Sequence, residues 1–230
     1  MPVNYKKMKK GIFRKRLNRF VAEVWIDGEI EKVHVKNTGR LKELLLPNAE
    51  VLLEESDQPN RKTKFSLIAV KKNEQWVNID SQAPNAVAFE AIANGKIAEF
   101  VELQQLKREV KFGDSRFDLY FETKEEKGFI EVKGVTLEKD GVAMFPDAPT
   151  TRGTKHILEL IKAVEEGYKG TILFIIQMEG CKYFTPNKET DPSFFNALIQ
   201  ASKQGVQILA YETKVRENSM VIGKQIPIHL

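Results

Sequence analysis

The sequence predicts two domains, a small β-barrel in residues 1–82 and an α/β domain in residues 83–230. Strand patterns dominate the first third of the chain, whereas helix and strand patterns alternate in the rest. With 230 residues, 42% of them hydrophobic and 30% charged, the chain has the size and composition of a globular protein of one or two domains. No apolar run is long enough for a transmembrane helix, so no membrane partner is expected.

Five short strands are predicted for the barrel. Alternating apolar residues from Phe20 to Ile26 indicate the first strand, and Asp27-Gly28 after it is typical of a hairpin turn. The other four strands are expected at 30–36, 50–55, 64–71 and 75–80.

A short helix is expected between the second and third of these strands. Leu41, Leu44 and Leu45 share one helical face, and Pro47 ends the helix. Five short strands favour an OB-like barrel, although a helix after the second strand does not lie at the position usual for that fold.

The pattern changes near Ala83-Pro84-Asn85, which marks the expected domain boundary. Helices are predicted at 85–94, 153–166 and 192–205. Strands are predicted at 107–112, 116–123, 128–135, 171–177 and 206–212. This order of one helix, three strands, and then alternating helices and strands indicates a mixed sheet flanked by helices.

The charge is unevenly distributed along the chain. Residues 1–20 contain eight of the 36 basic residues and none of the 32 acidic ones, so residues 21–230 carry 28 basic and 32 acidic residues. A basic run of this kind attracts a polyanion such as DNA, and a solvated tail is the alternative. We favour nucleic-acid contacts, and the residues expected to make them here are Lys9, Lys10, Arg14, Arg16 and Arg19.

Three charged residues are expected to converge on two neighbouring strands. Asp118 points away from the apolar face formed by the phenylalanines and leucine of strand 116–123, and Glu131 and Lys133 share the polar face of strand 128–135. If the two strands form a hairpin, the two carboxylates meet and need a cation, for which Mg²⁺ or Mn²⁺ with oxygen ligands is suited. Lys133 would hold a water nucleophile or stabilise charge on a phosphate; solvated cross-strand charges are the alternative.

This arrangement of an Asp, a hairpin and a Glu-x-Lys resembles the core of the PD-(D/E)XK nucleases, as does the order of the surrounding elements. The resemblance implies a metal-dependent endonuclease or exonuclease with Asp118, Glu131 and Lys133 in the catalytic site. Many such nucleases add a glutamate from the first helix, and Glu90 is the residue in that position here.

The segment FPDAPTTRGTKH, residues 145–156, combines a rigid loop with the start of a helix. Arg152, Lys155 and His156 lie at that start, where an anion such as a nucleic-acid phosphate would be favoured by the helix dipole and the free backbone N–H groups. An ion pair between Lys155 and Glu159 is the alternative for the lysine. Asp147 is expected to cap the loop or to act as an extra ligand.

Longer segments resemble one protein family over nearly the whole chain. They are NTGRLKELLLPNAEVLL (37–53), RKTKFSLIAV (61–70), REVKFGDSRFDLYFE (108–122), FIEVKGVTLEKDGVAMFPDAPTTRGTKHILEL (129–160) and FTPNKETDP (184–192). The sequence resembles the sugar fermentation stimulation protein A family of bacteria and archaea. The resemblance implies an N-terminal OB-like domain, a PD-(D/E)XK nuclease-like C-terminal domain, DNA binding and a regulatory role in sugar utilisation.

The remaining candidates are minor. Arg40 follows a predicted turn and is either part of it or a backbone contact to nucleic acid, and the aromatic residues Phe13, Phe20 and Trp25 are candidates for stacking on bases. The single cysteine, Cys181, allows no internal disulfide and indicates a reducing, cytoplasmic location. The sequence has no zinc-ligand spacing and no glycine-rich nucleotide-binding motif, so neither zinc nor a nucleotide cofactor is expected.

The favoured interpretation is a DNA-binding protein with a divalent-metal nuclease site. The alternative is a non-catalytic, largely sequence-nonspecific DNA-binding regulator that keeps a nuclease-like fold. A binding module for RNA or for another protein is a third interpretation.

Overall fold

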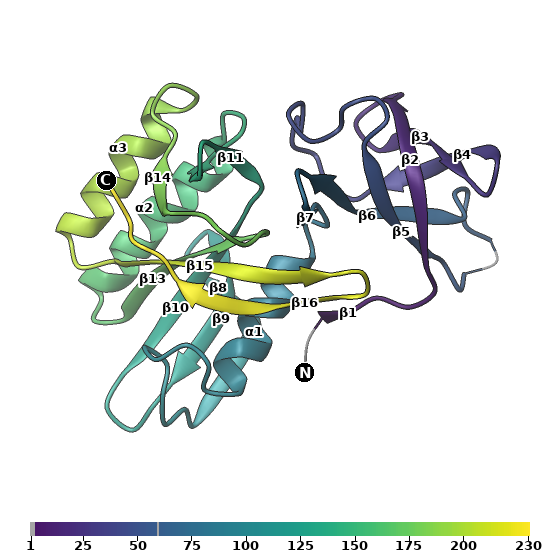
Figure 1. The fold of residues 1–230 in the computed structure, drawn as a ribbon. Helices are drawn as coiled ribbons and strands as arrows, with labels where there is room; N and C mark the ends of the chain where they lie inside the picture. The colour runs from purple at the N-terminus through teal and green to yellow at the C-terminus, as the bar shows by residue number, and fades with distance from the viewer. Residues whose placement is uncertain (1–2, 59) are drawn as a thin grey trace.

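The computed structural model describes residues 3–58 and 60–230, which form two domains side by side (Figure 1). Within these residues, no helix combines the length and the apolar character that crossing a membrane requires.

The N-terminal domain is a closed OB barrel. Its strands are hydrogen-bonded in the order β4-β3-β2-β5-β6-β7, and a parallel pairing of β4 with β6 closes the barrel. The bounds are β2 (Met8–Arg16), β3 (Val21–Ile26), β4 (Glu29–Val35), β5 (Glu50–Glu55), β6 (Phe65–Lys72) and β7 (Gln75–Asn78). The expected OB-like barrel is therefore confirmed.

Strand β2 was not expected, because its sequence looks like a basic tail. Only Gly11 and Phe13 of MKKGIFRKR are buried, so the strand has almost no apolar alternation. Gly11 is needed because a Cβ there would lie 2.8 Å from the carbonyl oxygen of Trp25. Once β2 is counted, the segment at 41–45 lies between the third and fourth strands of the barrel. The expectation that it follows the second strand is corrected, and the segment is a single turn in which Leu45 N–H donates to the Leu41 carbonyl at 2.9 Å.

The C-terminal domain contains a seven-stranded mixed sheet in the order β1-β16-β15-β13-β10-β9-β8. Its strands are β1 (Val3–Asn4), β8 (Gln105–Phe112), β9 (Ser115–Glu122), β10 (Lys127–Val135), β13 (Lys169–Ile176), β15 (Gln207–Arg216) and β16 (Ser219–Gln225). A separate small sheet contains β11 (Leu137–Lys139), β12 (Val142–Phe145) and β14 (Tyr183–Pro186).

The sheet is covered on both faces. Helix α1 (Ala83–Ala93) packs on one face, and α2 (Thr151–Glu165) and α3 (Pro192–Lys203) pack on the other (Figure 1). All three helices and the five strands expected in this domain are present. The strands missed from the sequence are short or lie near an edge of a sheet, where few residues are buried. Because β1 pairs with β16, the expected start of the barrel domain at residue 1 is corrected: residues 3–4 belong to the second sheet.

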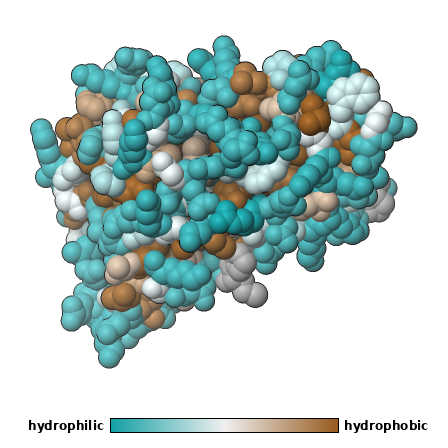
Figure 2. Space-filling view, viewed as in Figure 1, coloured by the Kyte–Doolittle hydropathy of each residue, from teal (hydrophilic) through white to brown (hydrophobic). Residues whose placement is uncertain are grey.

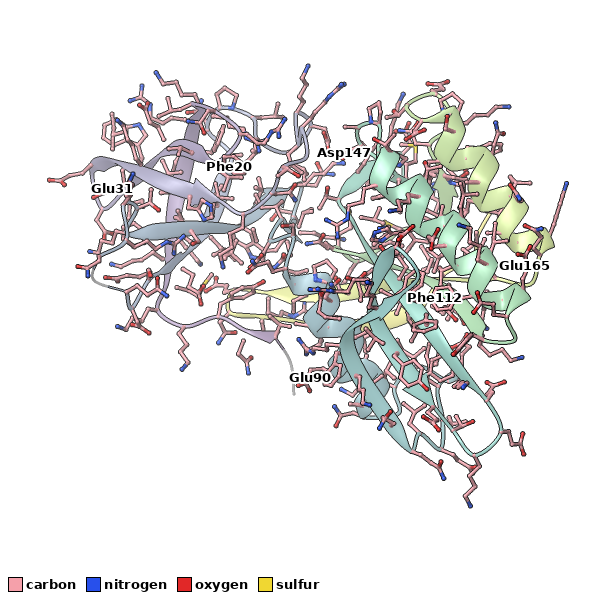
Figure 3. The ribbon with its side chains drawn as sticks, turned by 180° about the vertical axis from the view of Figure 1, so that it is seen from behind. Phe20, Glu31, Glu90, Phe112, Asp147 and Glu165 are labelled. Carbon is pink, nitrogen blue, oxygen red and sulfur yellow. The ribbon has the colours of Figure 1, made fainter. Side chains whose placement is uncertain are left out.

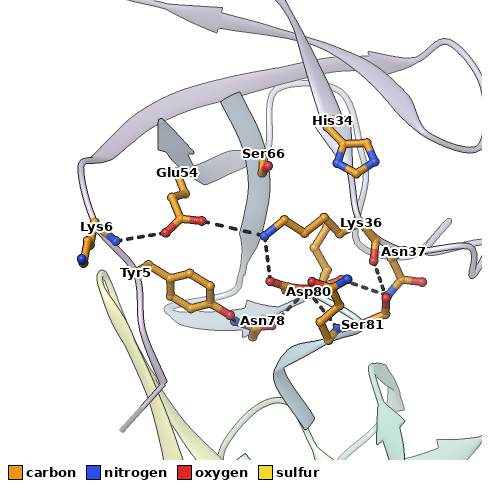
Figure 4. Close-up of polar contacts among 12 residues, drawn as sticks. Tyr5, Lys6, His34, Lys36, Asn37, Glu54, Ser66, Asn78, Asp80 and Ser81 are labelled. Atoms are coloured by element: carbon orange, nitrogen blue, oxygen red, sulfur yellow. Dashed lines mark hydrogen bonds and ion pairs between the residues drawn. The ribbon is translucent and has the colours of Figure 1, made fainter. Parts of the chain in front are cut away.

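A buried polar network joins the two domains (Figure 4). Gln177, at the end of β13, donates from Nε2 to both oxygens of Asn78 at 3.0 Å and to the Asp80 carbonyl at 3.2 Å. Asn78 in turn donates to the Tyr5 hydroxyl at 2.9 Å, and Lys36 forms an ion pair with Asp80 at 3.2 Å. Asn78, Asp80 and Gln177 are buried, so these bonds replace water and fix the barrel over the ends of the parallel strands.

Candidate functional site

The site lies where β9 separates from β10. The two strands pair antiparallel only as far as Leu119 and Ile130, and β10 then continues beside β13 alone. Asp118 lies at this split: its Oδ2 accepts the backbone N–H of Val132 at 2.8 Å, and its Oδ1 accepts Nδ2 of Asn85, on α1, at 2.7 Å.

The split also changes which face each side chain of β9 meets. Leu119 and Phe121 pack in the core on the α1 side, but Phe117 packs in the core under α2. The expectation that these three residues share one face is therefore corrected, and the change of face falls where the pairing of β9 with β10 ends, at Leu119.

Glu131 is the most deeply buried charged group of the site, with 2% of the residue exposed. Its Oε1 accepts from Lys133 Nζ and from His156 Nδ1, each at 2.5 Å. Its Oε2 is buried and has no hydrogen-bond partner among the described residues. One oxygen is thus fully engaged, and the other lacks the partner that a buried carboxylate oxygen requires.

The two carboxyl groups differ in their acidity. Burial, together with the charge of Glu131, raises the pKa of Asp118 to about 6. Burial acts on the pKa of Glu131 in the same direction, but the hydrogen bonds and charges of His156 and Lys133 outweigh it and lower that pKa. Near neutral pH, Glu131 therefore stays ionised, whereas Asp118 is more easily protonated.

These residues fit a divalent cation. Mg²⁺ is commonly held by one or two carboxylates and several waters. Glu131 has an oxygen without a partner among the described residues, and its charge acts on a second carboxyl group, that of Asp118. The described part of the chain contains no group of three or more His, Cys, Asp or Glu arranged for a metal. A metal here would depend on Asp118 and Glu131, with the remaining positions taken by water or substrate.

Glu90 does not join these residues, and the expected third ligand is corrected. Glu90 lines a pocket with Val3 and Met220, of β1 and β16, which lie on the other side of the sheet order from β9 (Figure 3). Asn85 contacts Asp118 instead, and five helical positions separate the two residues by about 140° around the helix. They are the only polar side chains of APNAVAFEAIA, so the sequence marked both but did not show which one faces the site.

In the basic segment, residues 1–20, most of the side chains expected to contact nucleic acid form ion pairs or hydrogen bonds within the protein instead. Lys9 pairs with Asp27 at 2.9 Å, and Lys10 pairs with Glu217. Arg16 donates to the carbonyls of five residues, which are Asn18, Arg19, Asn37, Gly39 and Arg40. Arg16 therefore holds loops together, which sequence reasoning did not reveal.

Three of the predicted nucleic-acid contacts on the barrel keep exposed side chains that form no ion pair with a described residue. The side chains of Arg14, Arg19 and Arg40 have no acidic partner within the described ranges, and Arg14 lies 5.4 Å from the centre of the Trp25 ring. Trp25 and Phe20 are 42% and 49% exposed, so they remain candidates for stacking on bases. Phe13 is buried in the barrel core, which corrects that expectation.

The start of α2 differs from the expectation in two respects. His156 is buried and bonds to Glu131, so it is not a surface contact for phosphate. Arg152 Nε approaches His156 Nε2 at 3.5 Å, which places the imidazole proton on Nδ1, the atom facing Glu131. Lys155 remains exposed and donates to the Asp114 carbonyl at 3.2 Å, while Glu159 pairs with Lys162 at 2.7 Å rather than with Lys155.

Asp147 joins the loop before α2 to the barrel. Its Oδ2 accepts the backbone N–H of Arg40 at 2.9 Å. Asp147 therefore caps a loop, which was one of its two expected roles. The capped loop is the one at Arg40 in the barrel domain, not its own loop before α2.

Comparisons with known proteins agree over the whole chain. Residues 15–79 match the family model "SfsA N-terminal OB domain", and residues 82–219 match "Sugar fermentation stimulation protein RE domain". A sugar fermentation stimulation protein homolog from Alkaliphilus oremlandii is 55% identical over 231 residues, covering 98% of each chain. One from Desulfitobacterium hafniense strain Y51 is 51% identical over 228 residues, covering 99% of each.

A solved structure is also similar. The SfsA of Pyrococcus furiosus, in complex with Ca²⁺, superposes with a TM-score of 0.91 at 28% sequence identity, and 100% of each chain is covered. The chain therefore belongs to the sugar fermentation stimulation protein family.

Proposed function

We propose that this protein binds DNA and hydrolyses its phosphodiester bonds at a divalent metal, Mg²⁺ or Mn²⁺, held by Asp118 and Glu131. The observation that carries the proposal is the buried Oε2 of Glu131, which has no partner among the described residues although the charge of Glu131 acts on Asp118 and helps to raise its pKa. Two carboxyl groups buried together are unfavourable unless a proton or a cation accompanies them, and a divalent cation would supply that charge.

Each neighbouring residue would have a defined role. When bound, the metal would supply positive charge to the phosphate and lower the pKa of a water molecule. Lys133, whose Nζ lies 2.5 Å from Glu131 Oε1, would hold the attacking water or stabilise charge on the phosphate. Asn85 and His156 would act as positioning residues, because they bond to Asp118 and Glu131, respectively.

The relatives support the metal and suggest a cellular context. The Pyrococcus furiosus protein was solved with Ca²⁺, a cation that takes oxygen ligands as Mg²⁺ does. The family is named for the stimulation of sugar fermentation, so we place DNA binding in the regulation of sugar utilisation.

The barrel would contribute the grip on the DNA. Arg14 lies against the exposed Trp25 ring, and a cation beside an accessible aromatic ring is how OB surfaces bind single strands through charge and stacking. Hydrophobic side chains are exposed among hydrophilic ones on this domain, at the right of Figure 2.

The test is cleavage of labelled single-stranded, duplex and branched DNA in Mg²⁺ or Mn²⁺. We expect the wild-type protein to cleave at least one substrate. Asp118→Asn should lower the cleavage rate by at least about 100-fold, which is the usual cost of removing one essential catalytic group. The matched control is Asp114→Asn, an exposed aspartate in the turn before β9, which should cleave like the wild type. If no substrate is cleaved by the wild-type protein, the hydrolysis proposal is wrong.

A second function has its own supporting observation. Lys133 and His156 both bond to Glu131 Oε1, so the protein supplies partners for one oxygen of this carboxylate without a metal. A carboxylate whose charge is already compensated by Lys133 and His156 favours a non-catalytic DNA-binding regulator that keeps the fold. That function predicts binding that weakens steeply with salt and does not change in Glu131→Gln.

A further inference from the structure

A pocket of about 380 Å³ lies between the two domains. Arg19 and residues 37–39 line it from the barrel, and residues 145–150 line it from the segment before α2. Gly134, Thr136 and Gln177 complete the lining from the ends of β10 and β13. Its volume is within the range of pockets that hold small organic groups.

The pocket adjoins the candidate metal centre through two elements. Gly134 directly follows Lys133 on β10, and Thr150 is the N-cap of α2, the helix that carries His156. The pocket also lies beyond the carboxyl ends of the parallel strands β10 and β13, where α/β sheets commonly bind ligands. A group bound in it would therefore lie near the candidate metal centre.

Most polar groups around the pocket are already bonded to one another. Asn37 Nδ2 donates to the Ile79 carbonyl at 2.9 Å, and Gln177 Nε2 is bonded to Asn78. Within residues 3–58 and 60–230, five polar side-chain groups of the lining make no hydrogen bond or ion pair. Two of them are the hydroxyl of Thr38 and Oε1 of Gln177. The other three, which differ in charge, are the guanidinium of Arg19, the hydroxyl of Thr136 and Oδ1 of Asp147.

These three groups have complementary roles. Arg19 is exposed and offers a cation at the rim, where a phosphate is bound favourably. Thr136 is only 8% exposed and offers a hydroxyl from the pocket lining. Asp147 Oδ1 can only accept hydrogen bonds while the carboxylate is ionised, so it favours an amino group and repels phosphate.

We propose that this pocket holds one nucleotide of the bound strand, unstacked from its neighbours, with its phosphate at Arg19 and a base amino group at Asp147. The proposal rests on nucleic acid being the substrate. It favours adenine, cytosine and guanine over thymine, which has no amino group. Because unstacking a base is easiest in a single or locally opened strand, that form is the preferred substrate.

The acceptor on Asp147 is fixed in advance. Its Oδ2 is held by the Arg40 N–H, and a Cβ on Gly39 would lie 2.5 Å from that oxygen, so a larger residue there would displace the carboxylate. Arg16 fixes the same loop through the carbonyls of Asn37 and Gly39, each at 2.7 Å. A pocket with its polar groups fixed loses little conformational entropy when it binds.

The test measures the affinity of the full chain for fluorescent dA, dC and dT hexanucleotides and for a 12-base-pair duplex. EDTA is present, so the result does not depend on metal or cleavage. We expect dA and dC to bind at least about tenfold more tightly than dT, as one lost hydrogen bond to a charged group implies, and the single strands to bind more tightly than the duplex.

Two variants probe the pocket itself. Thr136→Met, which fills it, should weaken dA and dC to the level of dT, and a melting curve checks that it folds. Asp147→Asn keeps an oxygen for the Arg40 N–H and removes the charge, so it should lose the preference over dT. Asp140→Asn, at an exposed turn, is the matched control and should keep it.

The results separate this proposal from the proposed hydrolysis. If all hexanucleotides bind equally to the wild type, or if Asp147→Asn keeps the wild-type preference, the nucleotide pocket is wrong even when DNA is cleaved. If the preference and its loss are observed but no DNA is cleaved in Mg²⁺ or Mn²⁺, the pocket is supported and the hydrolysis alone is wrong.

Discussion

Strand β2 and the split between β9 and β10 are both strongly charged, but their charges are satisfied to different extents. In β2, Lys9 and Lys10 form ion pairs, and Arg16 is saturated by carbonyl oxygens. At the split, Glu131 keeps a buried oxygen that has no partner in residues 3–58 and 60–230, and the pKa of Asp118 is raised to about 6, mainly by burial.

The difference shows that the number of charges in a segment does not measure its capacity to bind. The basic segment has the greater charge in sequence, yet folding uses several of its cations to hold strands and loops together. The acidic site has the carboxyl groups of Asp118 and Glu131. Folding buries both, and it leaves one oxygen of Glu131 without a hydrogen-bond partner among the described residues. An external cation has more to gain at the second region.

The largest expected effect comes from Glu131→Ala. The substitution leaves Lys133 and His156 without their shared partner in a buried site, so we expect a loss of about 4 kcal/mol in the free energy of unfolding, measured by urea denaturation. Glu125→Ala, on the exposed turn between β9 and β10, is the control and should change it by less than about 0.5 kcal/mol. If both substitutions lowered the free energy of unfolding equally, the bonds of Glu131 would contribute no more to stability than an exposed glutamate does.

The next effect tests the basic segment. Arg16→Ala removes hydrogen bonds to five carbonyls in two loops, the one between β2 and β3 and the one between β4 and β5, so we expect a loss of about 3 kcal/mol in the free energy of unfolding. Arg14→Ala removes only a surface contact with Trp25 and should cost less than about 0.5 kcal/mol. The comparison fails if the two arginines contribute equally to stability.

Asp118 gives a pH-dependent effect. Its pKa is about 6 in the folded protein, above the value of an unfolded aspartate, so the folded state binds the proton more tightly and loses stability as the pH rises from about 4 to above 6. Asp118→Asn removes this loss. In metal-free buffer at pH 7.5 we expect the variant to be more stable than the wild type by about 3 kcal/mol, and the advantage should disappear at pH 4. Thermal melts across this range measure it, and a constant difference at every pH would contradict the assignment.

The smallest effect is on the affinity for DNA, and it distinguishes a cation that is paired within the protein from one that is not. Lys9 is already paired with Asp27, so Lys9→Ala should change the affinity for a single-stranded oligonucleotide by less than about twofold and leave its salt slope unchanged. Arg19→Ala should reduce the slope of log K against log salt by about one phosphate contact. Titrations at several salt concentrations measure both slopes, and a loss of slope in Lys9→Ala would show that paired cations also bind.

The sequence predicted the elements near the site well, and local patterns explain why. Strands 115–122 and 127–135 alternate in polarity, so the side chains of Asp118, Glu131 and Lys133 could be placed before the structure was known. The contacts of Asn85 and His156 could not be predicted in this way. Their partners lie 33 and 25 residues away, and the packing of a helix on a sheet decides which of its polar residues faces the strand.

By itself, the sequence determined the three helices, most of the longer strands and the pair of carboxylates on neighbouring strands, because strand and helix periodicity is a local property. Only the tertiary structure decided that β2 is a barrel strand, that Asn85 rather than Glu90 contacts Asp118, and that His156 is buried against Glu131. It also decided which cations remain free. These outcomes depend on contacts between distant segments, where burial and hydrogen bonding determine which charges are satisfied within the chain.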